Sequence, residues 1–416
     1  MKLLFLAPYP PYPPRGGGQQ RMYQFVRRAA QHHQIWLLTF SPSPAATQAL
    51  DPLRSLCEVI TAPPPPHTSG KRLRTLLASP LPDMALRGRS PLFRRALDDL
   101  LRRTPFDIVQ AESIEMAQYG RPPGPDPAAP LYVYDAFNAE YLLQRRAFVT
   151  DLRQPRKLPI ALYSLIQWRK LHHYETQLGQ RCAGALAVSA DDAAALRRLA
   201  PRLPVAVVPN GVDADYFRRD AVTEPAPAAT PYVLFTGTLD FRPNIDAVTW
   251  FARHALPLVQ AALPATRFVV VGRNAAPEVL ACAQLPGVQI VGEVEDVRPW
   301  FHSAAAYVVP MRIGGGVRLK VLEAFAMEQA VVATTMGVEG IEGFTAGEHA
   351  LLADQPAAFA AHVIALLRDP DQGRRLGARA RTLALRYDWQ AIVPRMIETW
   401  QSWRQTERRT GRPAPP

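Results

Sequence analysis

The chain has 416 residues, of which 48% are hydrophobic and 20% are charged. This length exceeds a typical single core and predicts two globular domains, and the composition excludes a disordered or fibrous protein. Three widely spaced cysteines, and nine histidines without metal-ligand spacing, argue for a reducing compartment and against both a disulfide framework and a protein-bound zinc ion.

The net charge of +12 is unevenly distributed. Basic residues crowd residues 71–103 and 145–170, and such patches attract anionic membrane surfaces or phosphorylated ligands. The alternative is a solvated basic surface. Nucleic acid is not expected as a partner, because aromatic residues are not interleaved with the basic ones. No run approaches the roughly 20 apolar residues of a membrane span, so we expect a cytoplasmic protein, with peripheral attachment to the inner face of the membrane as a further hypothesis.

The first half of the chain alternates strand-like and helix-like segments. A helix is predicted over residues 19–31, and short apolar strands are predicted at 2–7, 35–39, 107–111, 131–135, 185–189 and 205–208. Strands that alternate with helices indicate a parallel doubly wound sheet, whose ligands bind at the carboxyl ends of the strands.

A proline- and alanine-rich stretch over residues 218–231 has the composition of a linker. Beyond it, strands are predicted at 232–236, 268–271, 288–291, 306–309, 330–334 and 350–352, with helices at 244–262 and 320–327. The sequence therefore predicts an α/β protein with an N-terminal domain over residues 1–217 and a C-terminal domain over 232–385. Residues 386–416 form a tail whose tryptophans, Trp389, Trp400 and Trp403, need an apolar surface.

The triple glycine at residues 314–316 lies between a predicted strand and a predicted helix. Glycines allow a close approach of the backbone to a ligand, and the free N–H groups of a helix start attract anions. Arg318 and Lys320 add cationic donors, and Glu323 lies one turn further along. The group suits a ligand with phosphate and sugar hydroxyls, although a glycine loop that only turns the chain is the simpler alternative.

Several segments, taken in order, resemble the retaining GT-B glycosyltransferases of family 4 over essentially the whole chain, including members that build exopolysaccharides. The similarity rests on residues 8–20, 135–141, 208–217, 235–246, 269–273, 292–296, 314–323 and 330–340. It implies two Rossmann-like domains that face a cleft, with the tail helix returning to the N-terminal domain. It also implies transfer of a hexose from a nucleotide-diphosphate sugar to a glycan or lipid-linked acceptor, with retention, in polysaccharide or glycoconjugate biosynthesis.

The same resemblance assigns roles to individual residues. Protein cations would stabilise the leaving diphosphate in place of a metal ion, so neither a metal nor another cofactor is expected. The catalytic candidates are Arg242, Lys320 and Glu323, of which Glu323 would bind the ribose hydroxyls. The candidates for donor binding are Gly17, Gly18, Gly237, Gly272, Arg273, Val294, Gly315, Gly316, Val317, Arg318 and Leu319.

Asp135, Asn138 and Glu140 are candidates for the acceptor side, and an ordinary network of helix cap and loop is the alternative for them. Two positions depart from the family pattern: Gly315 stands where the first glutamate of a Glu–seven residues–Glu motif is expected, and Phe137 where a histidine often precedes the asparagine. Two other functions therefore remain open, a sugar-nucleotide epimerase and a non-catalytic nucleotide-sugar-binding protein. An epimerase would convert the donor without an acceptor.

Overall fold

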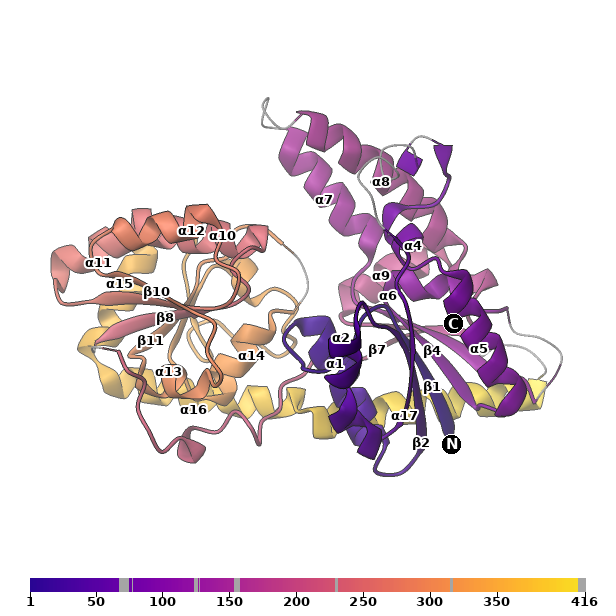
Figure 1. The fold of residues 1–416 in the computed structure, drawn as a ribbon. Coiled ribbons are helices and arrows are strands. Elements are labelled where there is room, and N and C mark those ends of the chain that lie inside the picture. Colours follow the sequence, from indigo (N-terminus) through magenta and orange to yellow (C-terminus); the bar gives the residue numbers. More distant parts are fainter. Residues whose placement is uncertain are drawn as a thin grey trace. The chain divides into compact units, whose positions relative to one another are not determined.

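The computed structural model divides the chain into two compact units: unit 1 comprises Met1–Pro209 and Ile392–Pro416, and unit 2 comprises Asn210–Ala391 (Figure 1). The structure describes all residues except 67–74, 77, 123–125, 127, 153–157, 229–230, 315–316 and 411–416. In this described part, no helix is both long enough and apolar enough to cross a bilayer.

Unit 1 is built on a seven-stranded sheet in the order β3-β2-β1-β4-β5-β6-β7, and all of its strand pairs are parallel. Its strands are β1 (Lys2–Ala7), β2 (Gln34–Phe40), β3 (Glu58–Ala62), β4 (Ile108–Glu112), β5 (Leu131–Ala136), β6 (Gly184–Ala187) and β7 (Val205–Val207). Its helices are α1 (Gly17–Ala29), α2 (Pro44–Gln48), α4 (Asp83–Arg87), α5 (Pro91–Arg103), α6 (Ser113–Met116), α7 (Glu140–Leu152), α8 (Leu158–Thr176), α9 (Ala190–Leu199) and most of α17 (Trp389–Thr410).

The strands of unit 1 are near-continuous apolar runs because helices cover the sheet on both faces. All six residues of β5 are buried, as are five of the six residues of β1. The tryptophans of α17 supply part of the cover: the ring of Trp400 lies 6.1 Å from that of Phe5 on β1, and Trp403 packs against Gly184 on β6. The expected apolar surface for the tail is therefore the sheet of unit 1.

Unit 2 has a six-stranded sheet in the order β10-β9-β8-β11-β12-β13, again with parallel pairs only. Its strands are β8 (Tyr232–Thr236), β9 (Arg267–Val271), β10 (Val288–Gly292), β11 (Ala306–Val309), β12 (Val331–Ala333) and β13 (Leu351–Leu352). Its helices are α10 (Arg242–Trp250), α11 (Leu256–Ala262), α12 (Pro277–Ala281), α13 (Arg298–Ser303), α14 (Leu319–Ala326), α15 (Pro356–Arg368) and α16 (Pro370–Ala384). A π-helical turn, Phe251–Ala255, joins α10 to α11.

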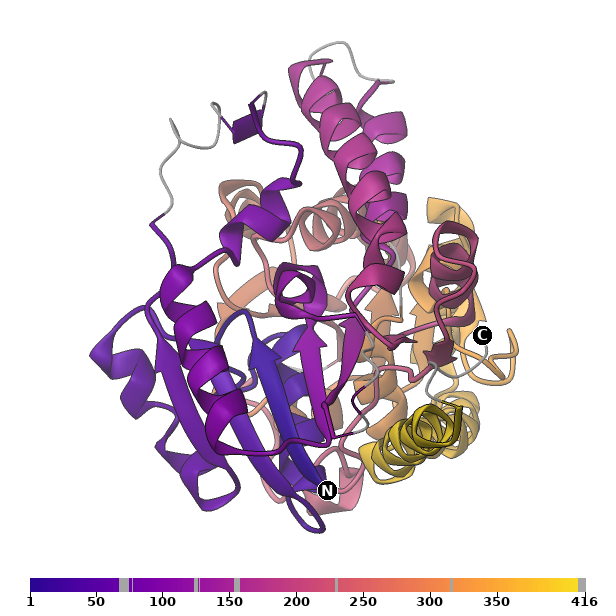
Figure 2. The same cartoon turned by 90° about the vertical axis from the view of Figure 1, so that its right-hand side faces the viewer.

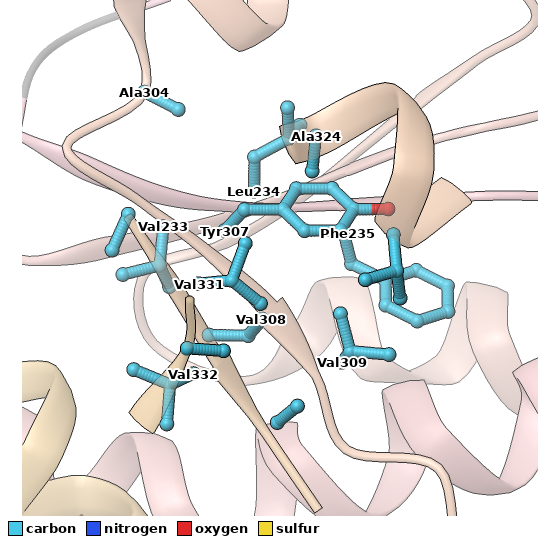
Figure 3. Packing of buried hydrophobic residues seen from close by; sticks show 14 of the residues in the cluster. Val233, Leu234, Phe235, Ala304, Tyr307, Val308, Val309, Ala324, Val331 and Val332 are labelled. Atoms are coloured by element: carbon cyan, nitrogen blue, oxygen red, sulfur yellow. The ribbon is translucent and has the colours of Figure 1, made fainter. Parts of the chain in front are cut away.

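The core of unit 2 is a single cluster that lies between residues 212 and 387. Figure 3 shows valines of the neighbouring strands β8, β11 and β12, among them Val233, Val308 and Val331, packed side by side. The buried hydroxyl of Tyr307 forms a hydrogen bond of 2.8 Å with Thr236 Oγ1, so this large side chain leaves no unpaired polar atom in the core.

The prediction of two doubly wound parallel-sheet domains is confirmed. Within that fold, the described residues of the stretch 218–231 belong to unit 2 and pack on its other residues: Arg219 donates to the carbonyl of His302, Ser303 Oγ accepts from the amide of Ala226, and Ala226 is buried. The chain passes between the units at Pro209–Asn210 and at Ala391–Ile392, whereas the sequence placed the ends of the domains at residues 217 and 385.

Candidate functional site

The donor-side candidates of unit 2 gather at one edge of its sheet. Gly237 follows β8, Gly272 and Arg273 follow β9, Val294 follows β10, and Arg318 to Glu323 begin α14 beyond β11. Because the strands are parallel, their carboxyl ends all meet at this edge, which is where ligands bind in open α/β sheets.

Lys320 is the centre of this group. Its ammonium donates to Asn244 Oδ1 at 2.8 Å and lies 4.0 Å from the centroid of the Phe235 ring. Asn244 is held in turn, since its Nδ2 donates to the carbonyl of Thr238 at 2.8 Å. Burial, together with the nearby charge of Arg318, lowers the pKa of Lys320 to about 7, although Glu323 acts in the opposite sense.

Two glycines make this close packing possible. A Cβ at Gly237 would stand 2.8 Å from Lys320 Nζ and 2.9 Å from Asn244 Nδ2, and the φ of +152° also favours glycine. A Cβ at Gly272 would stand 1.7 Å from the carbonyl oxygen of Gly237. At Gly272 a larger residue would therefore collide with the backbone, and at Gly237 it would displace the side chains of Lys320 and Asn244.

Two arginines extend the cationic surface of unit 2. Arg318 is the N-cap residue of α14, and a Cβ at Gly314 would stand 3.0 Å from its Nη2. Arg273 is half-buried, and its buried Nε has no hydrogen-bond partner among the residues that the structure describes. A buried guanidinium N–H without a partner is costly unless a ligand accepts from it.

The remaining donor-side candidates lie around this centre. Arg242 is exposed at the start of α10, two residues before Asn244. Glu323 is half-buried one turn into α14, Val317 is buried before that helix, and Leu319 and Val294 are half-buried. Gly315 and Gly316 lie outside the described residues.

Sequence reasoning missed the partners of Lys320. Asn244 and Phe235 lie within a segment that carried the family resemblance, but no role was predicted for either. The pair of Arg312 with Asp246 was missed as well: Arg312 Nη2 and Nε donate to the two carboxylate oxygens at 2.6 and 3.0 Å. The signal was only the presence of polar residues near strand ends, which does not identify their partners.

In unit 1 the predicted glycine loop precedes α1. Gly17 is the first residue of this helix, and its N-cap, Gly16, has no side chain to occupy the free N–H groups. A Cβ at Gly18 would stand 2.3 Å from the hydroxyl of Tyr9 and 2.8 Å from the ring of Phe137. Gly18 thus permits close contact of the first turn of α1 with Phe137, the residue that stands in place of the expected histidine.

Asp135 is fully buried in an ion pair. Arg21 on α1 donates to both carboxylate oxygens at 2.7 Å, and its Nη1 donates to the carbonyl of Pro209 at 3.1 Å. Glu112 is Asp135's neighbour on β4 and is also fully buried. Burial, and then the charge of Asp135, raise the pKa of Glu112 well above its usual range. Neither Arg21 nor Glu112 was predicted.

Asn138 and Glu140 lie at the start of α7. Asn138 Nδ2 donates to Glu140 Oε1 at 3.3 Å, while Glu175 accepts from the amides of Glu140 and Tyr141 at 3.0 and 2.9 Å. Burial raises the pKa of Glu140 to about 7 and that of Glu175 to about 8. Asn138 and Glu140 are thus part of a network around the helix cap, the alternative considered from the sequence, and their acceptor role stays a prediction.

Comparisons with known proteins agree with this geometry. The family model described as Glycosyltransferase Family 4 matches residues 15–216, and the model described as Glycosyl transferases group 1 matches residues 230–369. The two matches follow the two units of the structure, and together they cover most of the chain. The chain belongs to the family 4 glycosyltransferases.

Similar sequences and structures give the same fold class. A phosphatidyl-myo-inositol mannosyltransferase of Propionibacterium freudenreichii is 28% identical over 229 residues, which are 52% of this chain and 55% of that protein. The chain therefore spans about half the length of the curated relatives that it matches. A sucrose-phosphate synthase from Thermosynechococcus elongatus has a TM-score of 0.69 at 17% identity, over 97% of this chain and 99% of that one. Anabaena HepE, solved with UDP and glucose, has a TM-score of 0.64 at 15% identity, over 97% and 100%. These likenesses confirm the GT-B fold.

Proposed function

We propose that this protein transfers a hexose from a nucleotide-diphosphate sugar to a glycan or lipid-linked acceptor, with retention, in polysaccharide or glycoconjugate biosynthesis. The observation that carries the proposal is Lys320, fixed between Asn244 and the Phe235 ring at the carboxyl edge of the sheet in unit 2. This ammonium, with Arg318 and the start of α14, suits the charge that develops on a leaving diphosphate. HepE, a structural neighbour, was solved with UDP and with UDP-glucose, which supports a nucleotide sugar as the donor.

Each group has a distinct part in this mechanism. Lys320, Arg318 and Arg242 stabilise the two phosphates, and Glu323 accepts hydrogen bonds from the ribose hydroxyls. The leaving phosphate oxygen takes the proton of the acceptor hydroxyl, so that no protein carboxylate is needed as general base. The reaction proceeds without a metal ion, because the cations of the protein supply the charge.

The first experiment is a thermal-shift panel of UDP, GDP, ADP and their sugars, with and without EDTA. Selective stabilisation that EDTA leaves unchanged supports the donor site and its metal independence, and it names the base. If EDTA abolishes the stabilisation, the donor site needs a metal ion, which contradicts that part of the proposal. If no nucleotide changes the melting temperature, the proposal as a whole is contradicted.

Turnover separates the remaining alternatives. Lys320→Ala and Glu323→Ala should weaken nucleotide binding by about 10- to 100-fold, as expected for the loss of a hydrogen bond that involves a charge. Only a transferase also loses transfer to an added acceptor. Isomerisation of the donor alone would indicate an epimerase, and tight binding without any turnover would indicate a non-catalytic relative.

We further propose that the protein works in the cytoplasm, at the inner face of the membrane. Exposed arginines in the described parts of both basic stretches support an anionic lipid surface as a partner, among them Arg102 and Arg103 on α5 and Arg145 and Arg146 on α7. Binding to acidic vesicles should weaken as salt is added. Binding that is absent or insensitive to salt would contradict the proposed membrane partner but not the proposed reaction.

A further inference from the structure

Helices α7 and α8 form an antiparallel pair that extends beyond the sheet of unit 1 (Figures 1 and 2). The outer end of the pair consists of the last turn of α7 and the first turns of α8, and we call it the hairpin tip. Five large apolar side chains are exposed there by 41–59%: Val149, Leu152, Leu158, Ile160 and Leu162. Only thirteen such side chains are exposed in the described part of the chain, so the cluster is not a random scatter of surface residues.

Packing between the two helices does not cover the apolar side chains of the hairpin tip. The contact between them uses other residues, such as Phe148, which stacks on Trp168 with ring centroids 6.1 Å apart. Nearer the sheet, Gln167 Oε1 accepts from the amide of Asp83 at 2.9 Å and so ties α8 to α4. The exposed residues of the tip are therefore left over after the hairpin itself has packed.

The exposed charged side chains of the described hairpin are all positive. Two of its three carboxylates, Asp151 and Glu175, are buried, and Glu140 is half-buried. Arg145, Arg146 and Arg169 are exposed. Nearer the sheet, the ammonium of Lys170 donates to the carbonyls of Thr75 and Leu76. The described ends of the two helices thus present apolar side chains with cations beside them, and residues 153–157, which join the helices in the sequence, include three further cations.

These dimensions fit the interface of a bilayer. Residues 158–162 rise by about 6 Å along the helix axis, and interfacial helices bury their apolar residues about 5–10 Å deep at the boundary of head groups and acyl chains. Arg145 and Arg146 precede Val149 by about one turn of α7, so they lie close enough to reach lipid phosphates when the tip contacts the interface.

We propose that the hairpin tip binds at the interface of an anionic lipid bilayer, with its five apolar side chains at the boundary of head groups and acyl chains and the neighbouring cations, Arg145 and Arg146 among them, at the phosphates. The inference rests on the proposed membrane partner and assigns the contact to one surface. A second copy of the chain fits this surface less well. A symmetric dimer would bring the same arginines of two copies together, and the centres of protein interfaces are depleted of charge.

The apolar part is tested by co-sedimentation with phosphatidylcholine vesicles that contain phosphatidylglycerol, against vesicles of phosphatidylcholine alone. Leu158→Glu/Ile160→Glu should weaken binding by about tenfold or more, because a carboxylate replaces a side chain that leaves water. Leu280→Glu is the matched control, since Leu280 is 52% exposed in unit 2, and it should bind like the wild type. Equal losses in both variants would overturn the proposal.

The cationic part is tested with pairs of equal charge change. Arg145→Gln/Arg146→Gln should weaken binding by about fivefold for each arginine. The control, Arg374→Gln/Arg375→Gln, removes the same net charge from unit 2 and should have little effect. The side chains of Arg374 and Arg375 are exposed by 72% and 67%. Equal effects of the two pairs would show that net charge, and not the hairpin, carries binding.

Two further readouts separate this inference from the proposed function. Nucleotide stabilisation measured on every variant must match the wild type, so that a loss of vesicle binding reports on the tip and not on folding or on the donor site. Light scattering gives the oligomeric state: a wild-type dimer that Leu158→Glu/Ile160→Glu dissociates would overturn the proposal in favour of a second copy.

Discussion

At the scale of single residues, the charge of Lys320 should make donor binding depend on pH. Its pKa of about 7 means that the free protein loses this charge as pH rises through neutrality. A bound diphosphate favours the charged form and raises the pKa again, so binding takes up a proton. Affinity for a nucleotide-diphosphate sugar should therefore fall above pH 7, by at most about tenfold per pH unit.

Calorimetry with the intact donor sugar measures this effect. The sugar ester avoids the terminal phosphate of a free nucleotide, whose own second pKa of about 6 would interfere. Lys320→Arg is the matched control because a guanidinium stays charged throughout this range, and its affinity should vary less with pH. A wild-type affinity that stays constant from pH 6 to pH 9 would contradict the assignment.

Gly237→Ala should impair donor binding in addition to the loss of stability that the φ of +152° at this position brings. In Gly237→Ala the new Cβ would stand 2.8 Å from Lys320 Nζ, so the ammonium must move. We expect a loss of about 10- to 100-fold in nucleotide affinity, as for a lost hydrogen bond to a charged group. Gly347→Ala is the control: its φ is +81° but no atom lies within 4 Å, so strain should lower its melting temperature and leave its affinity unchanged. Similar affinities in both variants would contradict this role.

Glu112 should destabilise unit 1 as pH rises. Burial raises the pKa of this carboxyl in the folded protein, so the folded protein holds the proton to a higher pH than the unfolded chain, whose ordinary pKa is 4.5. The free energy of unfolding therefore falls with pH above this value by up to about 1.4 kcal/mol per pH unit. Glu112→Gln resembles the neutral acid and retains an acceptor for Gln110, so it should reduce this slope and raise the melting temperature near pH 8. Chemical unfolding at several pH values measures this dependence, and Glu348→Gln, at an exposed position, is the control. If the free energy of unfolding of Glu112→Gln falls with pH as steeply as that of the wild type, Glu112 is ionised in the folded state.

At the scale of elements, α17 is locked onto the sheet of unit 1 through Gly184. A Cβ at this position on β6 would stand 2.4 Å from Trp403 Cζ3, with two further ring atoms within 2.8 Å. Gly184→Ala should cost about 1–3 kcal/mol of stability through overpacking. Trp403→Leu alone should also destabilise, yet the double variant should recover part of the loss, because the smaller side chain leaves room for the methyl group. Denaturant unfolding of the four proteins measures the coupling, and additive losses would contradict this contact.

Most elements were predictable because buried parallel strands are short apolar runs bounded by turn residues. The bounds predicted for β1, β8 and β11 agree with the structure. β3 was missed because Glu58–Ala62 mixes polar and apolar residues at the edge of the sheet. The α7–α8 pair was missed as well, since its apolar residues surround both helices and have no clear helical period.

The candidate site was predictable only in part. Glycine loops and cations after strands mark the donor edge, and Lys320, Gly237 and Gly272 indeed lie there. The partner of a side chain depends on a contact that is distant in sequence, such as Arg21 with Asp135 across 114 residues. Periodicity carries no information on such pairs, which is why Asp135 was predicted as a polar group at a strand end and not as half of a buried ion pair.

At the scale of the whole molecule, the two units differ in how the chain builds them. Unit 2 is one continuous segment, whereas unit 1 needs residues from both ends of the chain. The core cluster of unit 2 lies entirely within residues 212–387, and the contacts of Lys320 with Asn244 and Phe235 lie within the same unit. Unit 2 therefore holds both its own core and the proposed diphosphate contacts.

We expect residues 210–391, expressed alone, to fold cooperatively and to bind the preferred nucleotide within about tenfold of the affinity of the full chain, a difference of about 1.4 kcal/mol. Residues 1–209 alone should be unstable, because they lack Trp400 and Trp403, and removing one buried tryptophan side chain costs about 3–5 kcal/mol. Circular dichroism melts and calorimetry on both fragments test this. A fragment 210–391 that folds but does not bind would show that the residues of unit 2 do not suffice for the donor, and a stable fragment 1–209 would show that α17 is dispensable for the sheet that it covers.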